Sequence, residues 1–165
     1  MIPWVLIAES IVYILPAYTS NAVPVIFGGG NPLDFGKVFK DGRPVLGAHK
    51  TFRGFFAGLM LGTLVGFGES FIFKNFNPIL GFTLSFGAVI GDVVGAFFKR
   101  RLGLKPGALL PVVDQVDFVV GAILFSLPVT TPQLNVILMI FVLTIPIHLL
   151  TNLFAFLLHL KEKPW

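Results

Sequence analysis

Three aspartates lie within strongly apolar stretches of the chain, where an ionised carboxylate is costly. Asp92 stands in the apolar run from Pro78 to Phe98, and Asp114 and Asp117 follow at i, i+3 spacing where the next run begins. Residues at this spacing share one face of a helix. Three unpaired carboxylates in one pocket would repel one another, so they must be neutralised by Lys and Arg or hold a divalent cation. All-oxygen ligation favours Mg²⁺, with Mn²⁺ as the other candidate.

Basic residues flank the same apolar runs. The segment 47–54 places Lys50, Thr51 and Arg53 where an apolar run starts, and the segment 99–105 contains four Lys or Arg residues. A helix N-terminus that carries cations and a hydroxyl is typical of a phosphate site. The alternative is that these residues only set membrane topology, which requires basic residues but no particular order. Gly28-Gly29-Gly30 could cradle phosphate through its backbone amides, although a bare glycine run is a weak signal.

Carboxylates that bind a metal, together with cations that bind phosphate, indicate phosphoryl or nucleotidyl transfer. The second pKa of a phosphomonoester is about 6, so a lipid phosphate is already a nucleophile at neutral pH and requires no general base. His49 lies in a polar loop and could contact phosphate. His148 and His159 are interpreted as packing or interfacial residues.

The elements that must position these groups are membrane helices. The 165 residues are 55% hydrophobic and only 12% charged, well below the roughly 25% charge of soluble domains, and the mean hydropathy is +0.89. The pattern predicts an all-α, polytopic integral membrane protein that forms a single transmembrane catalytic domain over residues 1–165. About five spans reach the roughly 20 apolar residues that a crossing needs, at about 2–21, 54–73, 78–98, 111–128 and 134–160.

The distribution of positive charge predicts the topology. Of the 12 Lys and Arg residues, all but Lys74 lie in the polar loops 22–53 and 99–110 or in the tail after residue 160. Five spans place these three regions on one side, which the positive-inside rule makes the cytoplasm. We therefore expect the N-terminus outside, the C-terminus in the cytoplasm, and a site that faces the cytoplasm from the cell membrane.

Two glycine series predict close helix packing. Glycine recurs every four residues at 58, 62 and 66 in the second span, and at 87, 91 and 95 in the third. Small residues at this spacing let helix backbones approach closely in lipid. The matching faces predict that the second and third helices pack on each other.

Several separated motifs together resemble the CTP-dependent cytidylyltransferases that make CDP-activated lipids, and are most similar to the archaeal branch. The resemblance covers nearly the whole chain. It rests on the segments 21–24, 28–37, 41–43 and 50–54, then on Gly91-Asp92, Lys99-Arg100-Arg101, Pro106-Gly107 and Asp114-Gln115-Val116-Asp117-Phe118. The bacterial and eukaryotic relatives have a longer signature, with His-Gly-Gly after Pro-Gly and Arg where this chain has Gln115.

The resemblance implies a reaction in which a lipid phosphate attacks the α-phosphorus of CTP and yields a CDP-lipid and pyrophosphate. The expected lipid is the isoprenoid ether-lipid phosphate 2,3-bis-O-geranylgeranylglycerol 1-phosphate, and no nucleic-acid partner is expected. The resemblance implies Mg²⁺ at Asp92, Asp114 and Asp117, with Lys50 as a further catalytic group. Phosphate contacts are expected from Lys50, Thr51, Arg53, Lys99 and Arg100, and substrate contacts or loop ordering from Asn21, Asp41 and Arg43.

Two other classes remain as alternatives. Another transferase of phospholipid synthesis, such as a CDP-alcohol phosphotransferase, would also use carboxylates and metal at a membrane face, but its Asp-Gly…Ala-Arg signature is absent from the sequence. A small non-enzymatic transporter predicts polar residues spread through the depth of the membrane, whereas Asp92, Asp114 and Asp117 gather at one end.

Overall fold

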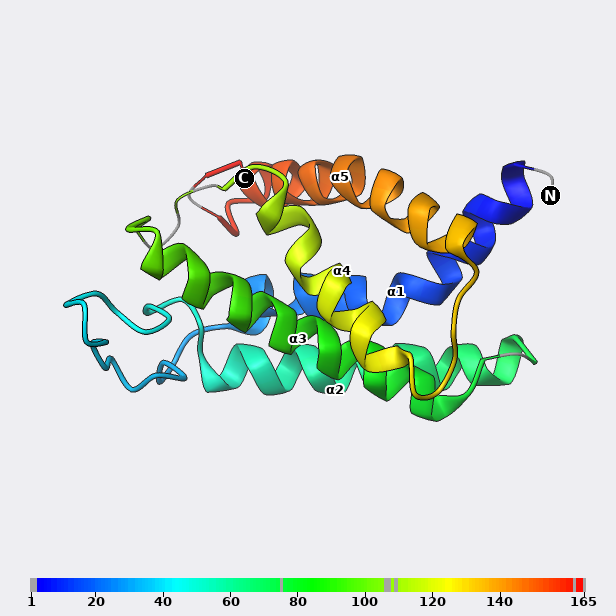
Figure 1. Ribbon diagram of the computed structural model, residues 1–165, viewed down its shortest axis with the longest axis horizontal. Coiled ribbons are helices and arrows are strands. Elements are labelled where there is room, and N and C mark those ends of the chain that lie inside the picture. Colours follow the sequence, from blue (N-terminus) through cyan, green and yellow to red (C-terminus); the bar gives the residue numbers. More distant parts are fainter. Residues whose placement is uncertain (1–2, 75, 106–107, 109, 162, 165) are drawn as a thin grey trace.

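The chain folds into a bundle of helices in the computed structural model, which describes residues 3–74, 76–105, 108, 110–161 and 163–164 (Figure 1). Across these residues the only β-structure is two isolated bridges, Pro32 with Thr51 and Val38 with Pro44. The all-α prediction is confirmed. The helices are α1 (Pro3–Phe27), α2 (Phe52–Ile72), α3 (Pro78–Arg101), α4 (Val113–Ser126) and α5 (Leu134–Leu157).

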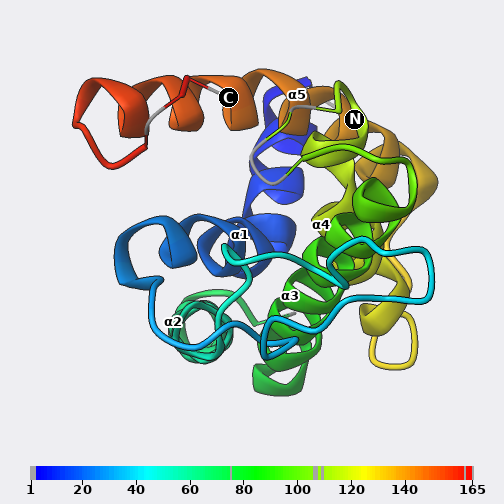
Figure 2. The same cartoon turned by 90° about the vertical axis from the view of Figure 1, so that its left-hand side faces the viewer.

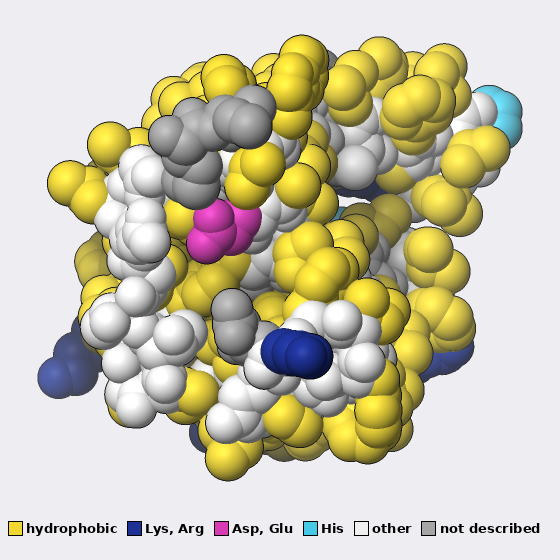
Figure 3. All heavy atoms as spheres, turned by 90° about the vertical axis from the view of Figure 1, so that its right-hand side faces the viewer, with side chains coloured by type: hydrophobic (Ala, Val, Ile, Leu, Met, Phe, Trp, Pro, Cys, Tyr) yellow, Lys and Arg dark blue, Asp and Glu magenta, His cyan; other side chains and the backbone are white. Residues whose placement is uncertain are grey.

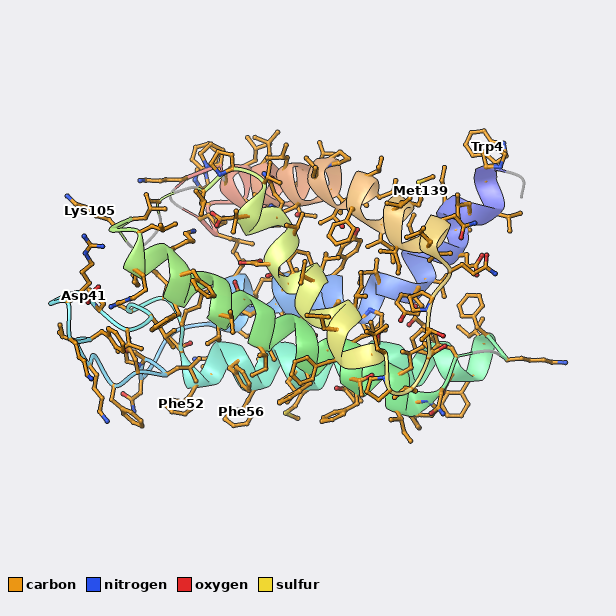
Figure 4. The ribbon with its side chains drawn as sticks, in the orientation of Figure 1. Trp4, Asp41, Phe52, Phe56, Lys105 and Met139 are labelled. Atoms are coloured by element: carbon orange, nitrogen blue, oxygen red, sulfur yellow. The ribbon has the colours of Figure 1, made fainter. Side chains whose placement is uncertain are left out.

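Successive helices run back and forth between the two ends of the bundle. The chain starts at the right of Figure 1 and reaches its C-terminus at the left after five passes. The loop between α1 and α2, the segment between α3 and α4, and the tail after α5 therefore all lie at the left, which we call the site end. Asp41 and Lys105 lie at this end and Trp4 lies at the other (Figure 4). The predicted grouping of the basic regions is confirmed.

Four of the described helices, α1, α2, α3 and α5, are long and apolar enough to cross a membrane. The fifth, α4, has 14 residues and is about 21 Å long at 1.5 Å per residue, against a hydrocarbon core of about 30 Å. It is therefore shorter than the predicted span 111–128 and begins at some depth within the bundle.

Three helices extend further toward the site end than the sequence predicted, and the smallest change is in α2, which begins at Phe52 instead of residue 54. The prediction ended the first span at Asn21, but α1 continues to Phe27 and includes Pro16 and Pro24. Proline is tolerated inside membrane helices where neighbouring groups satisfy the freed carbonyl. The third span was predicted to end at Phe98, but α3 runs to Arg101 and carries the basic triplet in its last turn. Cations there are favoured by the helix dipole.

The two glycine series have different neighbours. A Cβ at Gly58 or Gly62 would strike the Ser20 or Pro16 backbone of α1. Gly62 also faces the Ser85 hydroxyl of α3, and Gly66 faces Gly81 of α3. On α3 the series faces α4, because a Cβ at Gly87 would overlap the Gly121 carbonyl. The second and third helices pack on each other, as predicted, but the glycine series of α3 faces α4 and not the series of α2. Each series admits a different neighbour, and α3 is held between α2 and α4.

The core lies between α1, α3, α4 and α5. Ile14, Leu84, Phe118, Val119 and Ile140 are at most 2% exposed. Hydroxyl pairs cross this core, Tyr13 with Ser126 at 2.7 Å and Tyr18 with Thr144 at 2.9 Å. Buried hydroxyls need such partners because water cannot reach them.

The loop between α1 and α2 is organised by one buried carboxylate. The Asp34 carboxylate accepts hydrogen bonds from the backbone N–H groups of Gly36, Leu46 and Gly47, at 2.8–3.0 Å. Burial alone would raise the pKa of Asp34, but these three donors outweigh it and hold the pKa below its ordinary value. Hydrogen bonds within the loop therefore order it, and this fixes the position of the chain where it enters α2.

Candidate active site

A cavity of about 690 Å³ opens at the site end. Its walls come from α1, the α1–α2 loop, α3, α4, α5 and the tail after α5, so it is assembled from distant parts of the chain. Eight of the residues singled out in the sequence line it: Asn21, Lys50, Thr51, Asp92, Lys99, Arg100, Asp114 and Asp117. Gly28, Gly29, Gly30 and His49 line it as well.

Two of the aspartates are paired with lysines. Lys50 Nζ lies 2.6 Å from Asp92 Oδ1 and 2.5 Å from Oδ2. Lys99 Nζ lies 2.7 Å from Asp114 Oδ2. All four side chains are between 14% and 29% exposed, so the pairs are partly desolvated and stronger than surface ion pairs. Neutralisation by basic residues was one of the two outcomes that the sequence left open.

The third aspartate, Asp117, is held against α3. A Cβ at Gly95 would overlap the Asp117 carboxylate, and a Cβ at Gly91 would overlap the Asp117 carbonyl. Asp117 Oδ1 accepts a hydrogen bond from the Phe118 N–H at 2.7 Å. The charges of Asp92, Lys50 and Asp114 act on the same carboxylate. Because Gly91 and Gly95 have no side chains, α3 leaves space for the Asp117 carboxylate.

The carboxylates offer the right chemistry for a metal, but they do not converge on one point. Within the described part of the chain, no three carboxylate or imidazole groups stand close enough together to hold one ion. Asp114 Oδ1, however, is buried and has no hydrogen-bond partner among the described residues. A buried carboxylate oxygen without a donor is a ready ligand for a hard cation. The three carboxylates are thus the kind of ligand that Mg²⁺ prefers, while Asp92 and Asp114 are paired with lysines.

Arg100 offers binding capacity for an anion. Its side chain is 4% exposed, yet Nε and Nη1 have no hydrogen-bond partner among the described residues. A buried guanidinium normally has all its donors satisfied, because unmet donors are costly. Since Arg100 lines the cavity, an anionic oxygen there would satisfy it.

Thr51 positions Lys50. Its hydroxyl caps α2 by accepting the Gly54 N–H at 3.1 Å, and Lys50 O accepts the Leu33 N–H at 2.7 Å. These bonds fix the backbone on both sides of the Lys50 Cα. Lys50 is therefore directed into the cavity by a cap and a loop bond, while Thr51 itself is 5% exposed.

The entry to α4 holds a strained residue. Val112 has φ of 67°, a region that a β-branched side chain rarely adopts. The Gln115 side chain accepts the Val112 N–H at 2.8 Å, and Asp114 Oδ2 accepts the Leu110 N–H at 3.0 Å. Asp114 and Gln115 thus cap the helix that carries them, and this fixes the position of the Asp114 carboxylate.

Three residues singled out in the sequence lie outside the cavity lining. Asp41 pairs with Arg101 at 2.5 Å, and Arg43 Nη1 donates to the Arg101 carbonyl; both tie the α1–α2 loop to the end of α3. Arg53 is exposed on the first turn of α2. Pro106 and Gly107, part of the motif series, lie outside the described residues.

The sequence missed one wall of the cavity. His148 and Asn152 of α5, with Leu160, Lys161 and Lys163 of the tail, line it. The histidine was interpreted as a packing residue, and the tail lysines were counted only for topology. One signal was present: a histidine and an asparagine at i, i+4 share one face of an otherwise apolar helix.

An α-helical membrane fold with a charged cavity at one end, lined by carboxylates and cations, is typical of intramembrane enzymes. A solved structure described as an intramembrane enzyme for archaeal membrane lipids biosynthesis matches the fold with a TM-score of 0.84 and 36% identity, over 88% of this chain and 94% of that one.

The family model described as CarS-like, CDP-archaeol synthase, matches residues 3–165. The CDP-archaeol synthase of Methanopyrus kandleri is 46% identical over 98% of this chain and 95% of its own length. That of Pyrococcus furiosus is 43% identical over 96% and 98%. The chain belongs to the CDP-archaeol synthase family.

Proposed function

We propose that this protein is a CTP-dependent cytidylyltransferase that converts 2,3-bis-O-geranylgeranylglycerol 1-phosphate and CTP to CDP-archaeol and pyrophosphate. A phosphate oxygen of the lipid bonds to the α-phosphorus of CTP as the bond to the β-phosphate breaks. The observation that carries the proposal is one cavity whose lining combines Asp92, Asp114 and Asp117 with Lys50, Lys99 and Arg100. Its volume lies within the range of small-molecule sites.

The basic residues have the role of binding and aligning the phosphates. Lys50, Lys99 and Arg100 reach the cavity from the loop and from α3, so they can neutralise a triphosphate from one side. Charge that develops on phosphate oxygens in the transition state is stabilised by donors already in place. Holding both reactants in one cavity removes much of the entropic barrier.

Mg²⁺, with Mn²⁺ as a substitute, is proposed to be held by Asp92, Asp114 and Asp117. When bound, it would neutralise charge on the phosphates of CTP. In this proposal Lys50 and Lys99 exchange a carboxylate partner for a phosphate partner, which keeps each of the charges compensated. The unpartnered Oδ1 of Asp114 supports the assignment.

The site end is proposed to face the cytoplasm from the cell membrane, with the N-terminus outside. Support comes from the basic residues, which gather at the site end in the fold and obey the positive-inside rule in that orientation. CTP is a cytoplasmic nucleotide, so the same orientation brings the cavity to its substrate.

A transporter is less well supported by the structure. The cavity lies at one end, and the core beneath it contains apolar side chains such as Leu84, Phe118 and Val119. The hydroxyls of Tyr13 and Tyr18 that cross this core are paired with other hydroxyls. A transport path would require polar groups through the depth of the membrane.

The test is pyrophosphate release by the purified protein. With Mg²⁺ and CTP, we expect release only when a lipid phosphate is added, together with transfer of radiolabelled CMP to the lipid. A panel of ether- and ester-linked lipid phosphates sets the preference. Absence of release with every lipid of the panel would overturn the enzyme assignment.

A further inference from the structure

The end of α5 turns back on itself and brings the tail into the cavity. Leu160 N–H bonds to the Ala155 carbonyl and His159 N–H to the Phe156 carbonyl, both at 2.9 Å, and His159 has φ of 57°. This is the Schellman arrangement that ends many helices. Because of it, the chain folds back and Lys161 lies alongside the helix.

Lys161 is fixed by a short chain of polar contacts. Its Nζ donates to Asn152 Oδ1 at 2.8 Å, and Asn152 Nδ2 lies 3.1 Å from His148 Nδ1. The His148 ring stacks on Phe118 of α4, with the ring centroids 6.2 Å apart. The position of Lys161 is thus tied through α5 to the same helix that carries Asp114 and Asp117.

The charges around Lys161 favour an anion. Burial lowers its pKa, and the neighbouring cations Lys50 and Lys99 lower it further, against the opposing effect of Asp114. Together with Arg100, these lysines line one cavity. Cations that converge in a partly buried space are stabilised when an anion binds between them.

The wall that carries Lys161 is built on α5, the least buried of the four long apolar helices among the described residues. In the described part of the chain, α5 contacts α1 and α4 but neither α2 nor α3. Viewed from the site end, the C-terminal part of α5 stands apart from the C-terminal part of α1 (Figure 2). The space-filling view from the opposite end shows a hollow on one side of the molecule (Figure 3). Apolar residues Val25 and Ile26 of α1 and Leu160 of the tail line the cavity.

We propose that Lys161 binds the phosphate of the lipid substrate, and that Asn152 is the residue that positions it. A lipid whose chains remain in the bilayer reaches the cavity through the opening between α1 and α5, so its phosphate meets Lys161 first. The nucleotide meets Lys50, Lys99 and Arg100, which approach from the loop and from α3. The inference rests on the proposed function, because it assigns one substrate of that reaction to one wall.

The first experiment compares the KM values of both substrates in detergent micelles. Lys161→Gln, which keeps a donor for Asn152 but loses the charge, should raise the KM for the lipid phosphate roughly tenfold or more, as expected for one lost charge-assisted hydrogen bond. The KM for CTP should stay within about twofold. Lys161→Arg should retain most of the affinity, and Asn152→Leu should raise the same KM by a smaller factor.

The matched control is Lys40→Ala, because Lys40 is exposed in the α1–α2 loop and does not line the cavity. It should leave both KM values unchanged. A rise in the KM for CTP with an unchanged KM for the lipid would overturn the proposal and assign Lys161 to the nucleotide. Unchanged values for both substrates would also overturn it.

A second experiment does not depend on turnover. Binding of the radiolabelled lipid phosphate to the purified protein, without CTP, should weaken in Lys161→Gln and persist in Lys161→Arg and Lys40→Ala. Equal binding by wild type and Lys161→Gln would refute the assignment. If wild type binds the lipid in this way but releases no pyrophosphate, the proposed reaction fails while the lipid-binding role stands.

Discussion

The cavity has two walls of opposite character. The α3–α4 wall is packed backbone against backbone through Gly87, Gly91 and Gly121, and carries all three aspartates. The α5 wall is open: beyond Pro146 most side chains are exposed, including Leu149 and Leu153. In lipid, helix association depends on close packing more than on apolar area. The glycine-packed wall is therefore the stiff one.

Under the proposed function, this difference separates two tasks. Carboxylates that handle charge must hold their geometry to within a fraction of an ångström, so they stand on rigid, tightly packed helices. A substrate with long chains must enter from the bilayer, which is easier beside a helix with few contacts. In our proposal the same site thus combines a fixed wall for the chemistry with a loosely packed wall for access.

The largest expected effect comes from the carboxylates of the stiff wall. Asp114→Asn and Asp117→Asn should each reduce turnover at least about 1000-fold, because they remove several kcal/mol of charge stabilisation through the proposed metal. Chelation of divalent cations should abolish the wild-type activity, and added Mg²⁺ should restore it. Pyrophosphate release measures the activity of both variants and of the chelated wild type, and elution from a size-exclusion column checks that each variant is folded. Near-wild-type rates in both variants would remove the metal assignment.

The second prediction tests the fit between α3 and Asp117. Gly95→Ala should reduce turnover roughly 100-fold, since the added methyl displaces the Asp117 carboxylate and a shift of about 1 Å is enough for such a loss. Gly68→Ala is the matched control, because a Cβ there meets nothing within 4 Å. Equal rates in the two variants would show that the glycine series serves packing alone.

The third prediction concerns the loop that presents Lys50. Asp34→Ala leaves three backbone N–H groups without their acceptor, which should favour local opening by about 3 kcal/mol. Limited proteolysis within residues 28–51 measures this opening. Exposed Asp41 pairs with Arg101, so Asp41→Ala should have a much smaller effect on the same cleavage.

The low pKa of Asp34 also predicts how this loop responds to acid. The Asp34 carboxylate stabilises the folded loop fully when the pH is above 3.8, the ordinary pKa of an aspartate. This stabilisation is lost as the pH falls through the lower pKa that Asp34 has in the folded loop. Cleavage of the wild-type loop by an acid protease should therefore rise below pH 3.8. In Asp34→Asn that rise should be reduced, and an identical pH profile would contradict the linkage.

The smallest effect is expected at Arg53. It is exposed and does not line the cavity, so Arg53→Ala should change turnover by less than about threefold, as for most surface substitutions. Lys50→Ala, three positions earlier on the cavity side, should abolish most of the activity. A large loss in Arg53→Ala would mean that the phosphate site extends around the start of α2.

Much of this protein could be read from its sequence. Low charge and long apolar runs specify membrane helices, because an unpaired backbone group is too costly in lipid for any open structure. The placement of Lys and Arg predicted the five passes and the end at which the polar regions meet. The depth of Asp92, Asp114 and Asp117 singled out the residues that line the cavity, since carboxylates are rare inside apolar helices.

Tertiary structure alone decided which faces meet. The glycine series were visible in the sequence, but spacing cannot tell whether a small face receives α1, α3 or α4, because every such face is equally able to do so. Pairs such as Lys50 with Asp92 and Arg43 with Arg101 join residues far apart in the chain. The fold-back that brings Lys161 to Asn152 depends on the left-handed backbone of His159. This position is usually a glycine, so the sequence gives no signal for the turn. Composition and periodicity show which residues of a helix can face lipid or protein. They do not show which other helix it packs against, because that depends on side chains distant in the sequence.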